Sequence, residues 1–548
     1  MAPGPGNAGP NAGEERFDLI VIGAGINGAG IAREAALRGE RVLLLDKGDI
    51  ANGTTAWATR LIHGGLRYLE HGEVGLVRES LRERERLLRI APHLVRPLPL
   101  MIPIYRGDRR GRLLIGAGML AYDTLSFDKS LPRHRLLGGR AAAQREPGLA
   151  SAGLLGAALY FDAQVEFAER LAVENALDAR AHGGTVRTYH QVDRLLSQEG
   201  QVGGVTGHDV QTGNAFTALA PAVINVAGPW VDRVLAGTPQ VPATRLIGGT
   251  KGSHIIVAPF PGAPNDALYI EARQDGRPYF IVPWNGLYLI GTTDTHYDGD
   301  LDEVVAADWE IEFLLAETNR VIPSARLTPG DVLYTYAGVR PLPFGENGSE
   351  GSISRRHDIV DHGQNGGPKG LYSVVGGKLT TYRELAEQAV DYVRQRAGRP
   401  EVMSRTAALP LPGGRSATGW EAFRERFLQE SPLPRQASDH LLRVYGSRAV
   451  DILASAESAA LRQIIDPYSG AIAAEIPWAM QQEAARTLAD VLARRTMIGW
   501  GPSAGVGADR AAASVAREVL GWDAERAEAE VQAYRRWIAR YRPRALAE

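Results

Sequence analysis

Apolar runs separated by glycines in the first part of the chain predict strands that alternate with helices. Residues 18–22 and 42–45 are short apolar runs, and the stretch between them has apolar residues at helical spacing. This order is typical of a β–α–β unit with parallel strands. Beyond about residue 415, Ala, Glu, Arg and Leu recur at helical spacing. The pattern therefore predicts an α/β region followed by a helical one.

The 548 residues exceed what one hydrophobic core usually organises, so several domains are expected. Residues 1–15 lack the basic start and apolar core of a secretion signal and are predicted to be a disordered leader. Residues 16–400 are expected to hold the α/β part, residues 401–415 a linker and residues 416–548 a helical domain. Within that domain, helices are predicted at 420–428, 440–445, 477–496, 511–520 and 524–540.

Composition removes several classes of function. Lys+Arg 61 against Asp+Glu 63 gives a net charge of -2, which argues against general nucleic-acid binding. The chain has no cysteine, so thiolate metal sites, cysteine nucleophiles and redox-active thiol pairs are excluded, and we assign no metal ligands. Redox chemistry would need a bound cofactor. Lysine occurs only five times, so a lysine inside a motif stands out.

A glycine-rich turn follows the first apolar run. The sequence IVIGAGINGAG places Gly23, Gly25 and Gly28 between a strand and a helix, and Asp46 ends the second strand. Glycines here permit a tight turn, approach of the backbone to a pyrophosphate and close helix–strand packing, while the aspartate accepts from ribose hydroxyls. We interpret the turn as a dinucleotide site; a glycine-rich turn of another α/β fold is the alternative.

The position of this turn favours FAD over NAD. Other ligand-like motifs come hundreds of residues later, and FAD is long enough to need contacts from distant segments. The sequence NVAGPW at 225–230, which follows a predicted strand at 222–226, is interpreted as a second contact.

Five further motifs carry a resemblance to a known family. They are LIHGGLRYLEHGE from Leu61, KGSHIIV from Lys251, GTTD from Gly291, YAGVRPL from Tyr336 and GGKLTTYR from Gly376. In this order, over residues 17–383, the chain resembles the FAD-dependent glycerol-3-phosphate dehydrogenases of the aerobic, membrane-associated type. The region around 478–496 is similar to that family's helical C-terminal domain.

The resemblance implies a fold and a reaction. The fold would be a Rossmann-like FAD-binding domain of the glutathione-reductase/amino-acid-oxidase type, an interleaved β-sheet substrate domain and a C-terminal α-helical domain. The reaction would oxidise sn-glycerol 3-phosphate to dihydroxyacetone phosphate by hydride transfer to FAD, and a membrane quinone would then reoxidise the flavin.

A phosphate ester needs cations, and the motifs supply them. Arg67, Arg340, Arg355 and Lys378 are expected to bind the substrate phosphate, with the Tyr68 hydroxyl beside them. In an arginine-rich chain, a surface salt bridge is the alternative for each arginine. His63 is favoured as the general base beside Arg340 in the catalytic group, and His254 as a supporting residue near the flavin. For either histidine, a structural ring bonded to backbone is the alternative.

The flavin contacts come from several motifs. GGKLTTYR is expected to open a helix whose N-terminus faces the flavin, with Thr380 and Thr381 as candidate caps. Between the second strand and LIHGG the sequence NGTTAWATR departs from the serine-rich stretch that the family often carries, and the larger Trp57 is expected to shift this loop. The GTTD loop is expected on the substrate or flavin side. The predicted cofactor-binding residues are Gly23, Gly25, Asn27, Gly28, Asp46, Thr54, Thr55, His63, Ala227, Gly228, His254, Gly377, Lys378, Leu379 and Thr380.

Residues 98–127 mix apolar runs with Arg106, Arg109, Arg110 and Arg112, as a segment lying on a membrane surface does. The resemblance implies attachment to the cytoplasmic face of the membrane; a buried helix with a charged loop is the alternative. No run of 18 apolar residues occurs, and a cytoplasmic location is expected. An oxidase passing electrons to O₂, a flavin amine oxidase and a non-catalytic flavoprotein stay open as other functions, and a homodimer stays open as an assembly.

Overall fold

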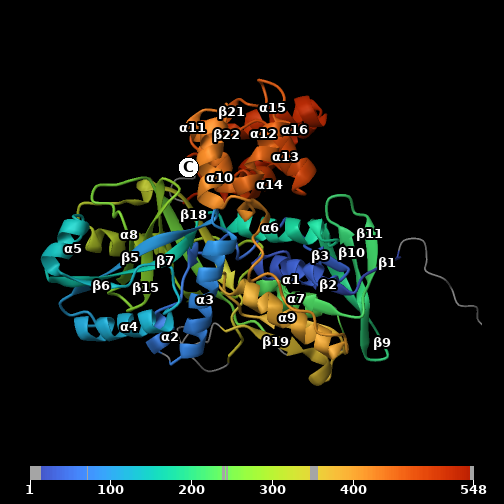
Figure 1. Ribbon diagram of the computed structural model, residues 1–548, viewed down its shortest axis with the longest axis horizontal. Helices are drawn as coiled ribbons and strands as arrows, with labels where there is room; N and C mark the ends of the chain where they lie inside the picture. Colours follow the sequence, from blue (N-terminus) through green and yellow to red (C-terminus); the bar gives the residue numbers. More distant parts are fainter. Residues whose placement is uncertain are drawn as a thin grey trace, which may run out of the picture.

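The computed structural model describes residues 14–543 except residues 71, 237, 239–240, 242–244 and 346–355. Two α/β layers lie side by side, and a helical domain formed by the end of the chain covers one edge of both (Figure 1). The predicted arrangement, a Rossmann-like α/β domain with an interleaved sheet domain and a helical C-terminal domain, is present in the structure.

The nucleotide-binding sheet has six strands in the order β19-β20-β12-β2-β3-β8. Its strands are β2 (Leu19–Ile22), β3 (Val42–Leu45), β8 (Thr185–Arg187), β12 (Val223–Asn225), β19 (Asp358–Asp361) and β20 (Leu371–Val375). All neighbours are parallel except β19, which runs antiparallel to β20. Helix α1 (Ile26–Leu37) contacts α6 (Ala168–Ala181) and α9 (Tyr382–Arg396). Both predicted strands of the β–α–β unit are therefore present, and their side chains are buried because helices cover the sheet.

A smaller sheet closes one end of this layer. It has the order β1-β11-β10-β9, with β1 (Glu14–Arg16), β9 (His190–Gln198), β10 (Gln201–Asp209) and β11 (Ala215–Leu219). The predicted disordered leader, residues 1–15, lies outside the described residues up to residue 13. Its last two residues, however, belong to β1, because the chain there pairs in parallel with β11.

The second layer is a large mixed sheet. Its strands are β4 (Leu61–Ile62), β5 (Val95–Tyr105), β6 (Arg135–Gly138), β7 (Leu154–Val165), β13 (Thr250–Val257), β14 (Ala267–Glu271), β15 (Pro278–Trp284), β16 (Leu287–Gly291), β17 (Thr295–His296) and β18 (Val332–Arg340). The helices around it are α2 (Arg67–Glu70), α3 (Val74–Ile90), α4 (Arg112–Leu125), α5 (Gly139–Arg145) and α8 (Asp308–Val321), while α7 (Val231–Ala236) belongs to the nucleotide-binding layer.

This sheet divides the segment that was expected to lie on a membrane surface. Residues 98–104 belong to β5, a strand paired with both β7 and β14, and Leu100 and Met101 are fully buried. Only the following part, α4 with Phe127, exposes large apolar side chains. The prediction is therefore wrong for residues 98–104, since this apolar run is sheet core. No helix in the described part of the chain is both long and apolar enough to cross a membrane.

The C-terminal domain is helical. Its elements are α10 (Trp420–Glu430), α11 (Arg435–Tyr445), α12 (Ala449–Ser455), β21 (Ile464–Asp466), β22 (Ala471–Ile472), α13 (Glu475–Gln482), α14 (Leu488–Asp490), α15 (Ala508–Leu520) and α16 (Ala524–Ala539). The single helical stretch predicted at 477–496 is wrong. Ala484 has a positive φ of 57°, and Thr487 accepts a hydrogen bond from the Asp490 N–H to start a new helix, which continues as a π-helix over Val491–Arg495.

The stretch predicted as a linker, residues 401–415, packs against the α/β part. The Leu411 side chain is fully buried, and its N–H donates to the Ile90 carbonyl at 2.8 Å. The Gly413 N–H donates to a carboxylate oxygen of Glu174 at 3.0 Å. The stretch 401–415 therefore attaches the start of the C-terminal domain to the α/β part.

Buried ion pairs join the helical domain to the nucleotide-binding layer. The Asp49 carboxylate accepts two hydrogen bonds from Arg495, at 2.7 and 2.8 Å, and one from Arg494 at 2.6 Å. A second pair joins Arg170 of α6 to Glu483. All of these side chains are 5% exposed or less. Because a buried charge without its partner is costly, these pairs fix where the helical domain sits.

We expect Asp49→Asn to lower the free energy of unfolding by about 3–5 kcal/mol, because Arg495 would lose its carboxylate in a buried site. Urea denaturation followed by circular dichroism measures the change. Asp439→Asn is the matched control, since Asp439 forms an exposed pair with Arg435 and should matter little. An unchanged urea midpoint for Asp49→Asn would show that the ion pairs of Asp49 with Arg494 and Arg495 contribute nothing to stability.

Candidate active site

A cavity of about 440 Å³ runs from the glycine turn to the motifs near residue 340 and residue 378. We call it the dinucleotide pocket. Its lining includes the following predicted cofactor residues: Gly23, Gly25, Asn27, Asp46, Thr54, Thr55, Ala227, Gly228, Gly377, Lys378 and Leu379. Segments far apart in sequence thus meet around one elongated cavity, as a long dinucleotide requires.

The glycine turn has the geometry that its sequence predicted. Gly23 has φ of +107°, and a Cβ there would lie 2.6 Å from the Val226 carbonyl oxygen. A Cβ on Gly28 would lie 1.8 Å from the Gly23 carbonyl oxygen. Gly28 itself does not line the pocket, so its role is to let α1 pack against the turn.

Asp46 reaches the pocket from the end of β3. One carboxylate oxygen accepts from the Ala24 N–H at 2.6 Å and the other from the Gly48 N–H at 2.8 Å. Burial raises the pKa of Asp46, and these two N–H donors oppose the rise. A carboxylate offers about four lone-pair positions, so ribose hydroxyls can bond to it beside the backbone donors.

Polar groups around the turn fit a dinucleotide. The Asn27 side-chain oxygen is buried and has no hydrogen-bond partner among the described residues. The Thr55 hydroxyl accepts from the Ile26 N–H at 3.0 Å and so organises the start of α1. Thr54 donates to the Val339 carbonyl at 2.7 Å, which joins its loop to β18. These residues can hold a pyrophosphate and the ring system of a flavin along the same cavity.

The GGKLTTYR motif meets LIHGG at the far end of the pocket. The Thr380 hydroxyl accepts from the His63 N–H at 3.1 Å, and α9 begins at Tyr382. The Thr381 side chain makes no capping bond. The expectation that Thr380 and Thr381 cap the helix is therefore wrong, because the Thr380 side chain is turned towards LIHGG.

Lys378 and Tyr68, two of the predicted substrate residues, are neighbours in the structure. The Lys378 ammonium lies 3.7 Å from the centre of the Tyr68 ring. Arg67, the neighbour of Tyr68, lines a different pocket under α4. Arg355 lies outside the described residues.

Arg340 is held against the GTTD loop. Its guanidinium donates to Asp294 at 2.9 Å and to the Thr292 hydroxyl at 3.1 Å. The side chain crosses Gly252, where a Cβ would lie 2.2 Å from a guanidinium nitrogen. The Gly376 N–H donates to the Pro341 carbonyl at 2.7 Å. The motifs of Arg340 and Lys378 are therefore adjacent.

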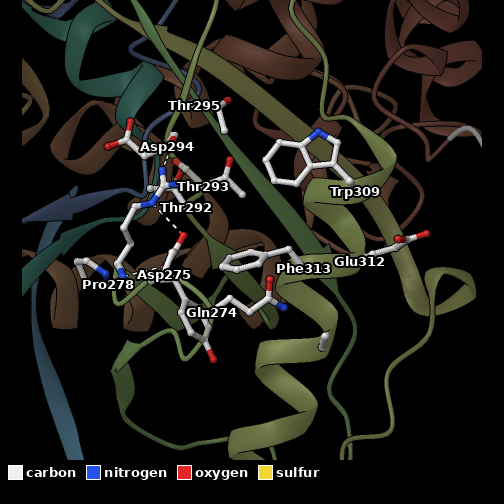
Figure 2. Close-up of a pocket in the computed structure, with 13 residues that line it drawn as sticks. Gln274, Asp275, Pro278, Thr292, Thr293, Asp294, Thr295, Trp309, Glu312 and Phe313 are labelled. Carbon is white, nitrogen blue, oxygen red and sulfur yellow. Dashed lines mark hydrogen bonds and ion pairs between the residues drawn. The ribbon is translucent and has the colours of Figure 1, made fainter. Parts of the chain in front are cut away.

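The GTTD loop also borders a second cavity, of about 490 Å³, between Thr292–Thr295 and α8 (Figure 2). Thr293 fixes the loop: its hydroxyl donates to Glu310 at 2.6 Å and accepts from the Ser253 N–H at 2.9 Å. Lys251 pairs with the same glutamate at 2.7 Å. Lys251 of the KGSH motif thus anchors the loop that holds Arg340.

His254 is buried next to the dinucleotide pocket but is not part of its lining. Its Nε2 is 2.9 Å from the Thr59 hydroxyl, and its ring packs on Tyr336 with the ring centres 4.9 Å apart. Burial lowers the pKa of His254 well below its usual value, and Arg340 and Arg60 lower it further. Neither His254 nor His63 lines the dinucleotide pocket. His63 packs edge-on to Phe280 at 6.4 Å between ring centres.

Two residues near the candidate site were not predicted from the sequence. One is Gly252, which leaves room for the Arg340 guanidinium. The glycine beside Lys251 in the KGSH motif was a possible signal for this close approach. Glu79 of α3 is the other. Burial and Glu384 raise the pKa of Glu79 to about 7, while Lys378 opposes the rise. Nothing in the local pattern of α3 distinguishes Glu79 from a surface glutamate.

The fold and this pocket define a flavin-dependent oxidoreductase, and comparisons with known proteins agree. Residues 18–383 match the family described as FAD dependent oxidoreductase, and residues 404–527 match the C-terminal domain of alpha-glycerophosphate oxidase. FAD is the cofactor of this class, as predicted.

Individual relatives narrow the family. The chain is 47% identical over 547 residues to a glycerol-3-phosphate dehydrogenase of Synechocystis sp., covering 96% of this chain and 97% of that protein. It is 37% identical to a D-erythritol 1-phosphate dehydrogenase of Brucella abortus, covering 88% and 94%. The structure of the Bacillus halodurans glycerol-3-phosphate dehydrogenase complexed with FAD matches with a TM-score of 0.77 at 28% identity, covering 96% and 95%. The chain belongs to the FAD-dependent glycerol-3-phosphate dehydrogenase family, and the resemblance seen in its motifs is confirmed.

Proposed function

We propose that this protein oxidises sn-glycerol 3-phosphate to dihydroxyacetone phosphate and passes the electrons to a membrane quinone. The observation that carries the proposal is the meeting of two cationic motifs at one end of the dinucleotide pocket. Lys378 lines that pocket, as do Val339 and Pro341 on either side of Arg340, and the Gly376 N–H donates to the Pro341 carbonyl. Cations beside a flavin site suit a substrate that carries a phosphate dianion.

In this proposal Lys378 and Arg340 bind the substrate phosphate, with Arg67, Tyr68 and Arg355 as the further predicted contacts. Asp294 and Thr292 hold the Arg340 guanidinium in one orientation, so less conformational freedom is lost when substrate binds. FAD, when bound, supplies the hydride acceptor.

His63 is the proposed general base. Protonating His254 is costly because the ring is buried and two guanidinium groups lie near it, and this lowers its pKa well below the usual value. A group with such a low pKa is a poor proton acceptor at neutral pH. In this proposal His254 positions the Tyr336 ring, on which it packs, and the Thr59 hydroxyl, to which it is hydrogen-bonded.

Anaerobic titration with sn-glycerol 3-phosphate tests the proposal. We expect the visible flavin absorbance to bleach with one equivalent of substrate. D-Erythritol 1-phosphate, the substrate named for the Brucella relative, serves as the competitor and should bleach the flavin only at higher concentration. Reduction by the erythritol ester alone would overturn the substrate assignment. Reoxidation by a short-chain quinone supports the acceptor, whereas stoichiometric hydrogen peroxide in air would instead identify an oxidase.

Arg340→Ala should weaken substrate binding by about 2–5 kcal/mol, because a charged hydrogen-bonded partner of the phosphate is lost. The expected result is a large increase in KM in a steady-state assay with a soluble electron acceptor. Arg273→Ala is the control, since Arg273 is an exposed arginine outside both cavities. Parent-like kinetics for Arg340→Ala would remove Arg340 from the substrate site.

The membrane part of the proposal is supported by α4. Leu113, Leu120 and Phe127 are 91%, 64% and 79% exposed, which is unusual for large apolar side chains. A cavity of about 280 Å³ under α4 is lined by the apolar Leu66, Leu114 and Ile115 and reaches Arg67 of the LIHGGLRY motif. An apolar quinone ring could thus approach the substrate motifs from the exposed side of α4. Of the predicted basic cluster, Arg110 is turned inwards and pairs with Glu70 and Glu271.

Leu113→Glu/Leu120→Glu should abolish sedimentation with vesicles of phosphatidylglycerol, because two charges replace the apolar contacts. Turnover with a soluble electron acceptor should be unchanged. Val519→Glu, on α15 in the C-terminal domain, replaces another exposed apolar residue and should sediment normally. Vesicle binding that survives the double substitution would exclude α4 as the membrane contact. The homodimer stays a prediction.

A further inference from the structure

The C-terminal domain reaches the dinucleotide pocket. Trp537 of α16 and Arg540 just beyond it are part of the pocket lining. The rest of the lining comes from the α/β part, including the glycine turn and β18. A helical domain that the sequence separates from the cofactor motifs by a linker therefore supplies part of the cofactor wall.

The end of α16 is tied to the strand that borders the pocket. The Tyr541 carbonyl accepts from the Thr335 N–H at 2.6 Å and from the Thr335 hydroxyl at 3.1 Å. Thr335 lies on β18, two residues before Ala337, which lines the pocket. These two bonds are buried. They set the position of the end of α16 relative to the pocket.

Aromatic packing explains the tryptophan that departs from the family pattern. The Trp57 ring lies 5.0 Å from Tyr541 and 5.9 Å from Trp500, both in the C-terminal domain. Trp57 also lines the pocket. Tyr336 of β18 packs on the same ring at 5.7 Å, so the large side chain at this position is matched by aromatic residues from both the sheet and the C-terminal domain.

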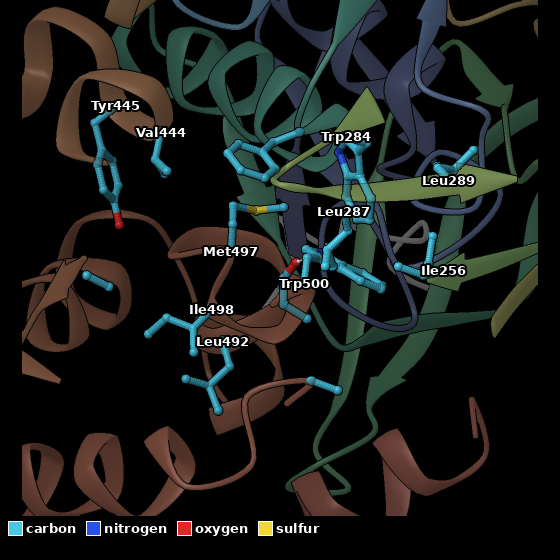
Figure 3. Close-up of a cluster of buried hydrophobic side chains, with 14 of the residues drawn as sticks. Ile256, Trp284, Leu287, Leu289, Val444, Tyr445, Leu492, Met497, Ile498 and Trp500 are labelled. Atoms are coloured by element: carbon cyan, nitrogen blue, oxygen red, sulfur yellow. Dashed lines mark hydrogen bonds between the residues drawn. The ribbon is translucent and has the colours of Figure 1, made fainter. Parts of the chain in front are cut away.

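The same interface continues into a common core. Trp500 and Met497 of the C-terminal domain lie beside Trp284 and Leu287 of the large sheet (Figure 3). The Trp284 and Trp500 ring centres are 6.3 Å apart. Val531, Tyr534 and Ile538 of α16 belong to the same buried cluster, so α16 packs into a core that it shares with the large sheet.

Arg540 brings a cation to the mouth of the pocket. Its guanidinium donates to the Asp302 carbonyl at 3.3 Å and to the Tyr541 hydroxyl at 2.9 Å. The Asp302 carboxylate pairs with Lys47, the residue after Asp46. Arg540 and Lys47 thus bond to the same residue, Asp302, and all three line the pocket, which is proposed to hold a ligand with a pyrophosphate.

We propose that the C-terminal helical domain completes the FAD site, with Trp537 packing on the bound dinucleotide and Arg540 pairing with its phosphates. The assignment rests on the FAD-binding fold and needs no particular substrate. It gives the helical domain a role in holding the cofactor besides that of a structural appendage.

Titration of the flavin-free full-length protein with FAD tests this directly, with flavin fluorescence as the readout. Arg540→Ala is expected to raise the dissociation constant about tenfold, the change expected for about 1.4 kcal/mol. Arg536→Ala is the matched control, because Arg536 is exposed on the same helix and lies outside the pocket lining. Its dissociation constant should equal that of the parent.

Trp537→Phe provides a second readout that does not depend on charge. Tryptophan emission of the parent should fall when FAD binds, and part of this quenching should be lost in the variant. Circular dichroism of each variant checks that the fold is kept. Parent-like dissociation constants for both Arg540→Ala and Trp537→Phe, with parent-like quenching in the latter, would overturn the proposal and leave α16 a packing element.

Discussion

The position of the helical domain depends on the Asp49 carboxylate. Asp49 lies three residues after Asp46, in the loop that leaves β3, and it binds Arg494 and Arg495 in a fully buried site. Although burial opposes ionisation, the two guanidinium groups lower the pKa of Asp49, so the pair stays charged. The next residues are tied to the glycine turn, since the Ala51 N–H donates to the Ala24 carbonyl at 3.0 Å. One loop therefore places both the cofactor strand and the C-terminal domain.

Buried arginines join distant segments of the chain elsewhere in the molecule as well. Arg60 forms two hydrogen bonds with Glu169, Arg383 two with Glu83, and Arg33 bonds both Asp178 and the Leu409 carbonyl. All three arginines are 1% exposed or less and join segments more than 100 residues apart. A planar group with five donors can satisfy such partners at once, which an ammonium cannot do. The balanced net charge therefore reflects pairing inside the fold as much as a neutral surface.

The sequence could predict features that depend on local backbone geometry. Gly23 and Gly28 were assigned from the turn they must make, and a Cβ at either position would indeed collide with backbone. Features set by distant contacts could not be predicted. The apolar run at 98–104 has the composition of a membrane-surface segment, and only its pairing with β7 and β14 makes it sheet core.

In the candidate site, too, local features could be predicted from the sequence and features set by distant contacts could not. Lys378 and Tyr68, which the resemblance placed in one cluster, are neighbours in the structure, whereas the pairing of Arg340 with Asp294 was not predicted. The break in the predicted helix at 477–496 had a local signal, because Thr487 and Asp490 form a capping box. The packing of Trp57 had no local signal, since its aromatic partners Tyr336, Trp500 and Tyr541 all lie more than 250 residues away in sequence.

If the enzyme gives its electrons to a membrane quinone, as proposed, the arrangement of α4 and α16 separates two demands on it. Helix α4 lies at one edge of the molecule and the C-terminal domain at the opposite edge (Figure 1). A flavin must stay bound through many turnovers, which favours a rigid wall such as the one formed by Trp537 with β18. An electron acceptor must enter and leave, and the cavity under α4, with Leu66, Leu114 and Ile115 in its lining, is a separate place where an apolar acceptor could bind. Because the two functions use different edges, a contact with the membrane through α4 would leave the cofactor wall undisturbed.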